Sequence, residues 1–318
     1  MSWLAPASLI LVGGVWGTLA RLGLVALNQY DGQSIAPLIW AQGVGCLVMG
    51  WASHKTTKAA IEASFAPAFP MLTTGFAGCC TSFSSWVLQV FEAFANTEHF
   101  DRHGLHNVMD ALTQTAATLG IGIASFWAGR AVGDSFPADR WLRLHVPKRY
   151  SLLLSLLAGV LTWVGAALLC GLYAPFRHVT WSLVFCPLGA WLRWQLARLH
   201  TPPSVDKKIP MHHVLSWPIG TFLANILGTM VLCGALIGQQ YGHITALPCG
   251  VLQGLQDGFA GSLSTVSTFI SEAVALRPLR TSFAYLFVSW SCGVILSLLL
   301  VGVPTWTLPN AHFAPCVP

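Results

Sequence analysis

The feature that most constrains this chain is a run of 23 residues, Tyr150 to Leu172, that contains no charged side chain. About 20 predominantly apolar residues form a helix long enough to cross the hydrocarbon core of a bilayer. The rest of the chain has the same character, since 8% of its residues are charged, against roughly a quarter in an average soluble domain. This amount of charge cannot cover the surface of a soluble protein of this length. We therefore expect an integral membrane protein.

Apolar runs bounded by charge or proline predict nine transmembrane helices. Their approximate ranges are 7–28, 35–52, 69–94, 107–130, 150–172, 179–199, 213–238, 246–275 and 281–303. The first run does not have the pattern of a cleaved signal peptide, because no basic segment precedes it and Arg21 lies inside it. We therefore expect it to remain as the first span.

The basic residues of the loops predict an orientation. Loops after odd-numbered spans hold only Arg102 and Arg177, and Arg102 lies close to Glu98 and Asp101. Loops after even-numbered spans hold Lys55, Lys58, Arg140, Arg143, Lys148, Arg149, Lys207, Lys208, Arg277 and Arg280. Because basic loops tend to stay in the cytosol, we expect the N-terminus in the cytosol and the C-terminus outside.

The chain also contains an internal repeat. GFAGCCTSFSSW, beginning at Gly75, resembles GFAGSLSTVSTF, beginning at Gly258, and AQGVG at 41–45 aligns with ANILG at 224–228. The distance from position 75 to 258 and from 42 to 225 is 183 residues in both cases. A third pair, GTLAR at 17–21 and GAWLR at 189–193, lies in the first span of each copy.

The repeat predicts two four-helix copies with one span between them. An odd number of intervening spans makes the second copy enter the membrane from the opposite side. We therefore expect an all-α membrane protein of nine transmembrane helices in a 4+1+4 arrangement of inverted repeats. The copies are 1–140 and 176–318, and 141–175 holds the linker helix. The alternative is that the fifth span is a lipid-facing helix without a topological role.

The repeated segment, rich in Gly, Ser and Thr, predicts a helix break in the middle of the membrane. Such a break occurs only where protein or a cavity satisfies the freed backbone groups. Two breaks that meet at a pseudo-two-fold axis would surround one ion with carbonyl oxygens. The alternative is close packing of unbroken helices through their small residues. The nine cysteines show no CxxC pair, and we expect most of them to be packing residues.

These motifs resemble those of the Fluc/CrcB/FEX fluoride channel family. The resemblance rests on GFAG followed by a Ser/Thr/Phe-rich segment, on GTFLANILG at 220–228, and on the GxxxR pattern of each first span. Two fused copies around a linker helix resemble the eukaryotic FEX branch. The resemblance implies a fluoride-selective channel of the plasma membrane, not an enzyme. It would export cytosolic fluoride down its electrochemical gradient and confer fluoride resistance.

The resemblance also implies site residues and a bound ion. The implied fluoride pore consists of Asn225, Phe83, Phe269, Tyr285 and Ser289. A structural Na⁺ would be held by backbone carbonyls of the two breaks, at Gly78, Thr81, Gly261 and Ser264. The implied partners are fluoride and the lipid bilayer, with no nucleic acid. The fused chain would act as a monomer equivalent to a dimer of separate copies.

The two copies differ where the family pattern is most specific. The first keeps Phe83 but has Trp86, and the second has Val266 but keeps Phe269. Gln42 stands in the first copy where Asn225 stands in the second. On the fourth span, Gln114, Thr118 and Gly122 replace the Tyr285, Ser289 and Gly293 track. We therefore expect one working pore, with Phe83 and Phe269 facing it together, and one degenerate pore.

Some alternatives remain open at this level. Arg21 and Arg193 would either draw anions into vestibules or tie helix ends together. A proton-coupled secondary transporter of small anions or drugs would also use inverted repeats. It would need a central carboxylate in each copy, but Asp257 and Glu272 are paired with Thr74 and Gln89. A membrane enzyme is disfavoured, because the sequence shows no recognisable set of nucleophile, base and orienting residue.

Overall fold

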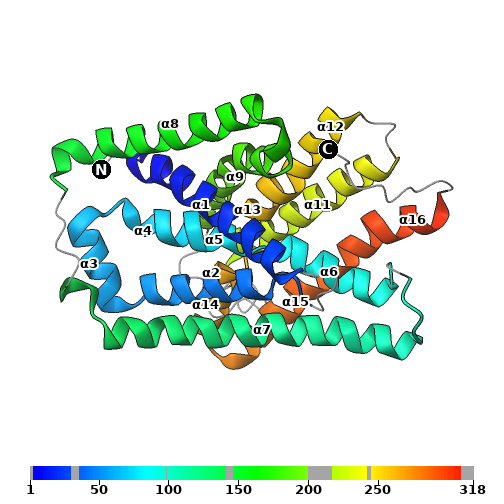
Figure 1. The fold of residues 1–318 in the computed structure, drawn as a ribbon. Helices are drawn as coiled ribbons and strands as arrows, with labels where there is room; N and C mark the ends of the chain where they lie inside the picture. The colour runs from blue at the N-terminus through cyan, green and yellow to red at the C-terminus, as the bar shows by residue number, and fades with distance from the viewer. Residues whose placement is uncertain are drawn as a thin grey trace.

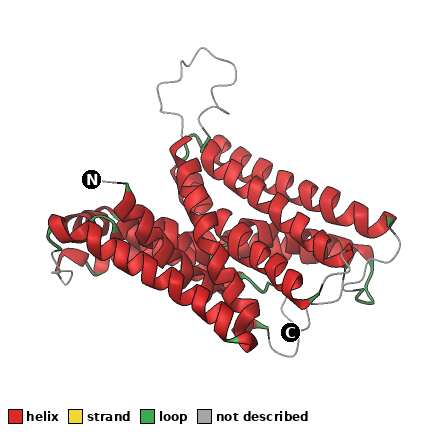
Figure 2. Cartoon of the chain, turned by 90° about the horizontal axis from the view of Figure 1, so that it is seen from above, coloured by secondary structure: helices red, strands yellow, loops and turns green. Residues whose placement is uncertain are grey.

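A computed structural model describes residues 3–29, 36–97, 99–140, 146–199, 217–241 and 245–308. Within these ranges the chain is built from helices and contains no strand (Figure 2). Three basic residues used above to predict orientation, Arg143, Lys207 and Lys208, lie outside the described residues.

Each apolar range predicted to span the membrane is mainly helical where the structure describes it, and the ranges 69–94 and 246–275 each contain a short non-helical break. The elements of the first copy are α1 (Leu4–Asn28), α2 (Ile39–Ala52), α3 (Lys55–Phe65), α4 (Ala68–Pro70), η1 (Met71–Ala77), α5 (Gly78–Cys80), α6 (Phe83–Ala95) and α7 (Gly104–Ser135). Those of the second copy are α9 (Arg177–Leu196), α11 (Ile219–Tyr241), α12 (Ala246–Gln253), η5 (Gly254–Ala260), α13 (Gly261–Leu263), α14 (Ser267–Ala275), α15 (Leu279–Ser297), η6 (Leu298–Gly302) and α16 (Val303–Thr307). The first copy ends with the short turn η2 (Ala138–Arg140). Between the copies lie α8 (Lys148–Leu172) and the turn η3 (Ala174–Phe176), and η4 (Ala197–Leu199) follows α9.

Four described helical stretches are long and apolar enough to cross a membrane, judged by length and composition. They are Leu4–Asn28, Arg149–Leu172, Ile219–Gln240 and Leu279–Thr307. The other predicted spans are shorter, interrupted or more polar. The fold is therefore that of an all-helical, multi-pass membrane protein. The number of spans and their inverted arrangement stay predictions.

One helix was not predicted. The segment Lys55–Phe65, read as a cytosolic loop because of its lysines, forms α3. It buries Thr57 and Ile61, four residues apart on one face, and Lys58 lies 3.9 Å from Glu62 on another. A charged amphipathic helix of this length is less hydrophobic than a transmembrane helix, so the pattern of apolar runs does not predict it.

The helix between the copies lies at the edge of the bundle. In Figure 1, α8 runs alongside α1 and α9, and it packs against both. Large apolar side chains on α8 remain exposed, among them Leu153, Leu157, Leu161 and Leu168. This exposure suits a helix that contacts lipid along most of its length.

The two copies interlock at equivalent positions. α6 packs against α11 and α15 of the second copy, and α14 packs against α2 and α7 of the first. Gly17 lies so close to the Phe76 carbonyl that no Cβ would fit there, and Gly189 lies equally close to the Phe259 carbonyl. Small residues thus allow each first helix to approach the interrupted helix of its own copy. The sequence repeat is therefore accompanied by equivalent helix contacts in the two copies.

The cysteine prediction holds in part. Cys46, Cys79, Cys80, Cys170, Cys186, Cys233 and Cys292 are free, and all except Cys292 are buried. Cys249, in the first turns of α12, is instead disulfide-bonded. The apolar sequence around Cys249 does not predict this disulfide. Disulfides persist in oxidising surroundings, and the apolar pattern does not show on which side of the membrane a cysteine lies.

Candidate functional site

The predicted helix breaks are present in both copies and face each other. α5 ends at Cys80, and Thr81 has an extended backbone with φ −100° and ψ 148° before α6 begins at Phe83. α13 ends at Leu263, and Ser264 is extended with φ −83° and ψ 156°. α5 and α13 pack against each other. The breaks therefore share one buried centre.

Hydroxyl groups cross between the copies at this centre. The Thr81 Oγ1 accepts hydrogen bonds from the backbone N–H groups of Val266 and Ser267, each at 3.1 Å. The Ser264 Oγ accepts one from the N–H of Ser84 at 3.0 Å. These N–H groups lie at the starts of α14 and α6, where the helix itself supplies no acceptor. Each break therefore caps a helix of the other copy.

Asn225 and Gln42 occupy equivalent places beside the breaks but bind differently. Asn225 Oδ1 accepts the N–H of Thr265 at 2.8 Å, and its Nδ2 donates to the Thr265 carbonyl at 3.3 Å. Gln42 Nε2 donates to the Ser82 carbonyl at 2.9 Å. The Gln42 Oε1 is buried and has no partner among the described residues. The second copy thus holds its break with two bonds, and the first with one.

The two intramembrane arginines are buried against the breaks. Arg21 donates to the Gly261 carbonyl at 2.7 Å and also to the Asp257 carbonyl, both in the other copy. Arg193 donates to the Ser262 carbonyl at 2.9 Å and, across the copies, to the Thr74 carbonyl at 2.7 Å. These contacts are those expected of arginines that tie helix ends together. The vestibule role stays a prediction.

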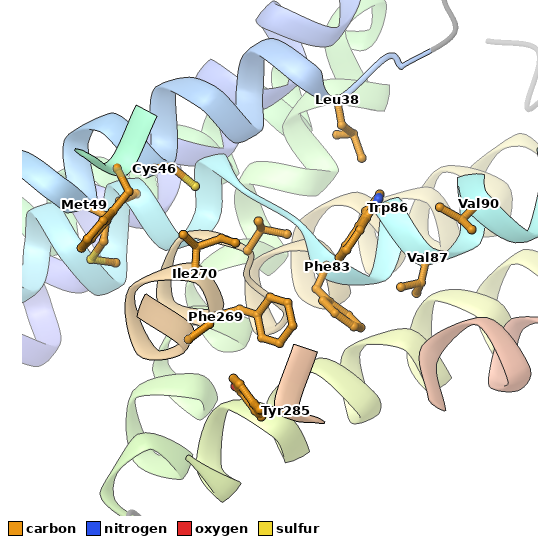
Figure 3. Packing of buried hydrophobic residues seen from close by; sticks show 14 of the residues in the cluster. Leu38, Cys46, Met49, Phe83, Trp86, Val87, Val90, Phe269, Ile270 and Tyr285 are labelled. Carbon is orange, nitrogen blue, oxygen red and sulfur yellow. The ribbon is translucent and has the colours of Figure 1, made fainter. Parts of the chain in front are cut away.

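Aromatic rings from both copies meet beside the centre. The rings of Phe83 and Phe269 lie 5.3 Å apart, centroid to centroid, in an edge-to-face arrangement. Phe269 in turn lies 5.0 Å from Tyr285, and Phe83 lies 5.5 Å from Trp86 on the opposite side. Figure 3 shows Phe83, Phe269 and Tyr285 gathered together. The structure thus brings together the two phenylalanines expected to face one pore.

The polar track of α15 lies along these rings. A Cβ at Gly293 would be 3.0 Å from Phe83 Cε1, so the ring packs directly on this glycine. One turn earlier, Ser289 is fully buried, and its Oγ has no hydrogen-bond partner among the described residues. Tyr285, another turn earlier, donates its hydroxyl to Glu272 at 3.1 Å. Tyr285, Ser289 and Gly293 are four residues apart and share one face of α15. We call this face, together with the rings of Phe83 and Phe269, the wall of the second copy.

The sequence analysis did not predict a role for three polar residues at this site, Thr221, Ser84 and Ser267. Thr221 donates to Glu272 at 2.7 Å, so the carboxylate is held from both sides. Ser84 and Ser267 take part in the crossing hydroxyl network, where they approach Ser264 and Thr81 at 2.8 and 3.2 Å. Their signal was present in the sequence, since both are Ser at equivalent positions of the repeated segment.

The equivalent wall of the first copy is more apolar. Gly122 lies against Ile270, with a Cβ 3.2 Å from Ile270 Cγ1. Trp86 is buried, and its indole N–H has no partner among the described residues. Gln114, which replaces Tyr285, donates to Asp110 at 3.2 Å. This side therefore lacks the ring pair and the tyrosine, but Thr118 keeps a buried hydroxyl at the position of Ser289.

A cavity of about 1050 Å³ lies at the end of this first-copy wall. It is lined by Gln29, Pro37, Gln89, Glu92, Ala93, Asn96, Thr97, Phe100, Asp101, Arg102, His103, His106, Met109, Asp110, Thr113 and Gln114. Within it, Arg102 pairs with Asp110 at 3.0 Å. The polar cavity ends at Gln114, where the packed apolar wall begins.

The backbone carbonyls predicted to hold Na⁺ lie where the regular helical hydrogen bonds of the two breaks end. The last regular helical bonds are accepted by Ala77 and Ala260, from the N–H groups of Thr81 and Ser264. The carbonyls of Gly78 and Gly261 come one residue later and are free of that ladder. Gly261 accepts from Arg21, which leaves its carbonyl a second lone pair. Neutral oxygens of this kind coordinate Na⁺ in broken membrane helices.

Comparison with known proteins places the chain in a family. The family model described as CrcB-like protein, Camphor Resistance (CrcB), matches residues 8–130 and, a second time, residues 180–303. The chain belongs to the CrcB family. Two CrcB copies are therefore fused in one polypeptide, with α8 in the unmatched segment between them.

Among CrcB relatives, the chain is 34% identical to Fluoride export protein 1 of Candida albicans, over 94% of this chain and 80% of the relative. It is 30% identical to Fluoride export protein 1 of Schizosaccharomyces pombe, over 91% of this chain and 93% of the relative. The bacterial Fluoride-specific ion channel FluC of Aromatoleum aromaticum is 36% identical over 36% of this chain and 79% of its own length. No solved structure matches the chain.

Proposed function

We propose that this CrcB chain is a fluoride-selective channel that lets cytosolic fluoride leave the cell. Its full-length relatives are named fluoride export proteins, and its bacterial relatives are named fluoride-specific ion channels. A membrane potential that is negative inside drives the anion outward by about 2.3 kcal/mol per 100 mV. A passive pore therefore suffices for export and for fluoride resistance.

The observation that carries this proposal is the ring pair of Phe83 and Phe269 beside the free hydroxyl of Ser289. An aromatic ring has a positive edge, so rings that turn their edges to a path stabilise an anion. A buried hydroxyl without a partner costs free energy unless a ligand or water occupies it. A fluoride ion in this path would meet both kinds of group and no fixed positive charge to trap it.

We propose one conducting pathway, on the side of the α15 track. The residues assigned to it are Asn225, Phe83, Phe269, Tyr285 and Ser289. On the other side, Val266 and Ile270 pack in place of Phe83 and Val87, and Gln114 replaces Tyr285. This side therefore has aliphatic side chains in place of a phenylalanine ring and an amide in place of the tyrosine hydroxyl, so it offers fewer of the groups that would replace the hydration shell of fluoride.

For the architecture we propose nine spans in a 4+1+4 arrangement, with copies 1–140 and 176–318 inverted around the linker helix in 141–175. The N-terminus lies in the cytosol and the C-terminus outside, in the plasma membrane. The disulfide of Cys249 supports this orientation. It lies at the end of α12 assigned to the outside, and disulfides persist in oxidising surroundings.

We further propose a structural Na⁺ at the buried centre, held by carbonyls of Gly78, Thr81, Gly261 and Ser264. The ion would supply a positive charge that fixes the two breaks relative to each other. The extended backbones of Thr81 and Ser264 and the ladder-free glycine carbonyls support this assignment. A single fused chain provides all four ligands, so it acts alone as the equivalent of a dimer.

The test uses purified full-length protein in liposomes with an external fluoride electrode. We expect rapid fluoride efflux when valinomycin sets a driving potential, with no accompanying proton movement and little chloride efflux. Slow fluoride movement that follows a pH gradient would instead support a proton-coupled transporter. Absence of fluoride efflux at any potential would contradict the proposal.

A further inference from the structure

The crossing hydroxyls act on the helices that carry the phenylalanines. Thr81 of the first copy accepts the N–H groups of Val266 and Ser267, and Phe269 follows two residues later on α14. Ser264 of the second copy accepts the N–H of Ser84, which directly follows Phe83 on α6. The first turn of each helix is therefore fixed by the opposite copy.

The first turn of each helix also has a cap from its own copy. The crossing bonds are therefore not needed to form the helix, and their contribution can be considered separately. Ser82 Oγ accepts the N–H of Ser85 at 3.3 Å. At the equivalent place, Thr265 Oγ1 accepts the N–H of Thr268 at a longer 3.5 Å. The local caps keep the helices formed. The crossing bonds set where each helix begins relative to the other copy, and hence the separation of the two rings.

From this geometry we infer that the hydroxyls of Thr81 and Ser264 are positioning residues for the ion pathway. Each holds the phenylalanine of the opposite copy at the edge-to-face distance. This role rests on the proposed fluoride function. It differs from the sodium proposal, which uses backbone carbonyls, although the Thr81 hydroxyl also lies 3.5 Å from one of these, the Gly78 carbonyl.

The two hydroxyls are not equal. Thr81 Oγ1 accepts two backbone N–H groups, whereas Ser264 Oγ accepts one. Both also contact neighbouring hydroxyls: Thr81 contacts those of Thr265 and Ser267 at 3.1 and 3.2 Å, and Ser264 contacts those of Ser82 and Ser84 at 3.4 and 2.8 Å. The Thr81 methyl also packs tightly on Gly45. Removing the Thr81 hydroxyl therefore disturbs Phe269 more than removing the Ser264 hydroxyl disturbs Phe83.

The test compares Thr81→Val, which keeps the shape but removes the hydroxyl, with Thr81→Ser, which keeps the hydroxyl. Thr73→Val is the matched control, because Thr73 Oγ1 bonds the Phe69 carbonyl within the same helical segment at 2.9 Å. Fluoride efflux is measured per channel, in liposomes made at a protein-to-lipid ratio so low that most hold one protein or none. A residue that only stabilises the fold changes the number of active channels but not their individual rate.

We expect Thr81→Val to lower the per-channel fluoride rate at least tenfold and to raise relative chloride efflux. Thr81→Ser should recover the rate to within about threefold of the wild type, and Thr73→Val should leave it unchanged. Ser264→Ala should lower the rate less than Thr81→Val, and it tests the same arrangement if Thr81→Val fails to incorporate. A wild-type rate for both hydroxyl deletions, or a Thr81→Ser rate as low as Thr81→Val, overturns the inference. If the wild-type protein carries no fluoride, the proposed function is wrong and the positioning role falls with it.

Discussion

Replacement of Phe269 by isoleucine separates a pore role from a packing role. The Phe269 ring lies 5.3 Å from Phe83 and 5.0 Å from Tyr285. Aromatic pairs contribute about 0.5–1.5 kcal/mol each beyond burial, so Phe269→Ile removes about 1–3 kcal/mol of packing. Trp86→Ile removes one such pair, at 5.5 Å, together with a larger buried side chain. The two substitutions therefore cost similar stability.

Their effects on transport should differ. A desolvated cation over a ring face gains about 2 kcal/mol, and we use the same magnitude for an anion at the positive ring edge. Each 1.4 kcal/mol is a factor of about ten. Loss of the Phe269 ring edge should thus lower fluoride efflux roughly thirtyfold or more, and Phe83→Ile should do the same. Trp86→Ile should stay within about threefold of the wild type, because Trp86 lies on the side away from the α15 track.

The assay is potential-driven fluoride efflux from liposomes, with thermal unfolding in detergent measured on the same preparations. Similar losses of melting temperature with a large difference in efflux would support the pore assignment. If Trp86→Ile abolishes efflux while Phe269→Ile retains it, the conducting side has been assigned wrongly. Equal losses of efflux in both variants would mean that packing alone explains the effect.

Three further predictions follow from the centre of the molecule. Asn225→Ala should lower fluoride efflux and the melting temperature more than Gln42→Ala, because Asn225 makes two bonds to its break and Gln42 one; equal effects would contradict the proposed asymmetry. Arg193→Lys should lower the melting temperature by several degrees, since a single ammonium cannot reproduce the planar fork that reaches carbonyls of both copies. Replacing Na⁺ by a large organic cation during purification should lower the melting temperature reversibly, and an unchanged melting temperature would argue against the structural ion.

The positions of the helix breaks could be predicted from the sequence, and their partners could not. The repeated segment placed the interruptions near Thr81 and Ser264 because small polar residues in a membrane span require an external partner. That Thr81 accepts the N–H groups of Val266 and Ser267 from the other copy, besides donating to the Ala77 carbonyl of its own, depends on how the copies cross, which no local pattern encodes. The sequence likewise marked Arg21 and Arg193 as unusual but left two roles open, and their buried carbonyl contacts appear only in the fold.

Elements away from the repeated motifs show the same limit. α3 was missed because its lysines and glutamate lower its hydropathy, although Thr57 and Ile61 are spaced to bury one face. The disulfide of Cys249 was missed because an isolated cysteine in an apolar run looks like any packing residue. Hydropathy identifies which segments are buried in the membrane or in the protein. It does not identify the partners against which these segments pack.

The crossing caps also bear on how the chain is made. The Thr81 hydroxyl and the Val266 N–H that it accepts are 185 residues apart in sequence. At ribosomal rates of about 5–20 residues per second, roughly 10–40 s pass between the synthesis of these two groups. During that interval the break of the first copy lacks the hydrogen-bond partners that the second copy supplies. The speed of synthesis and insertion of the second copy therefore sets how long this surface is open to wrong partners.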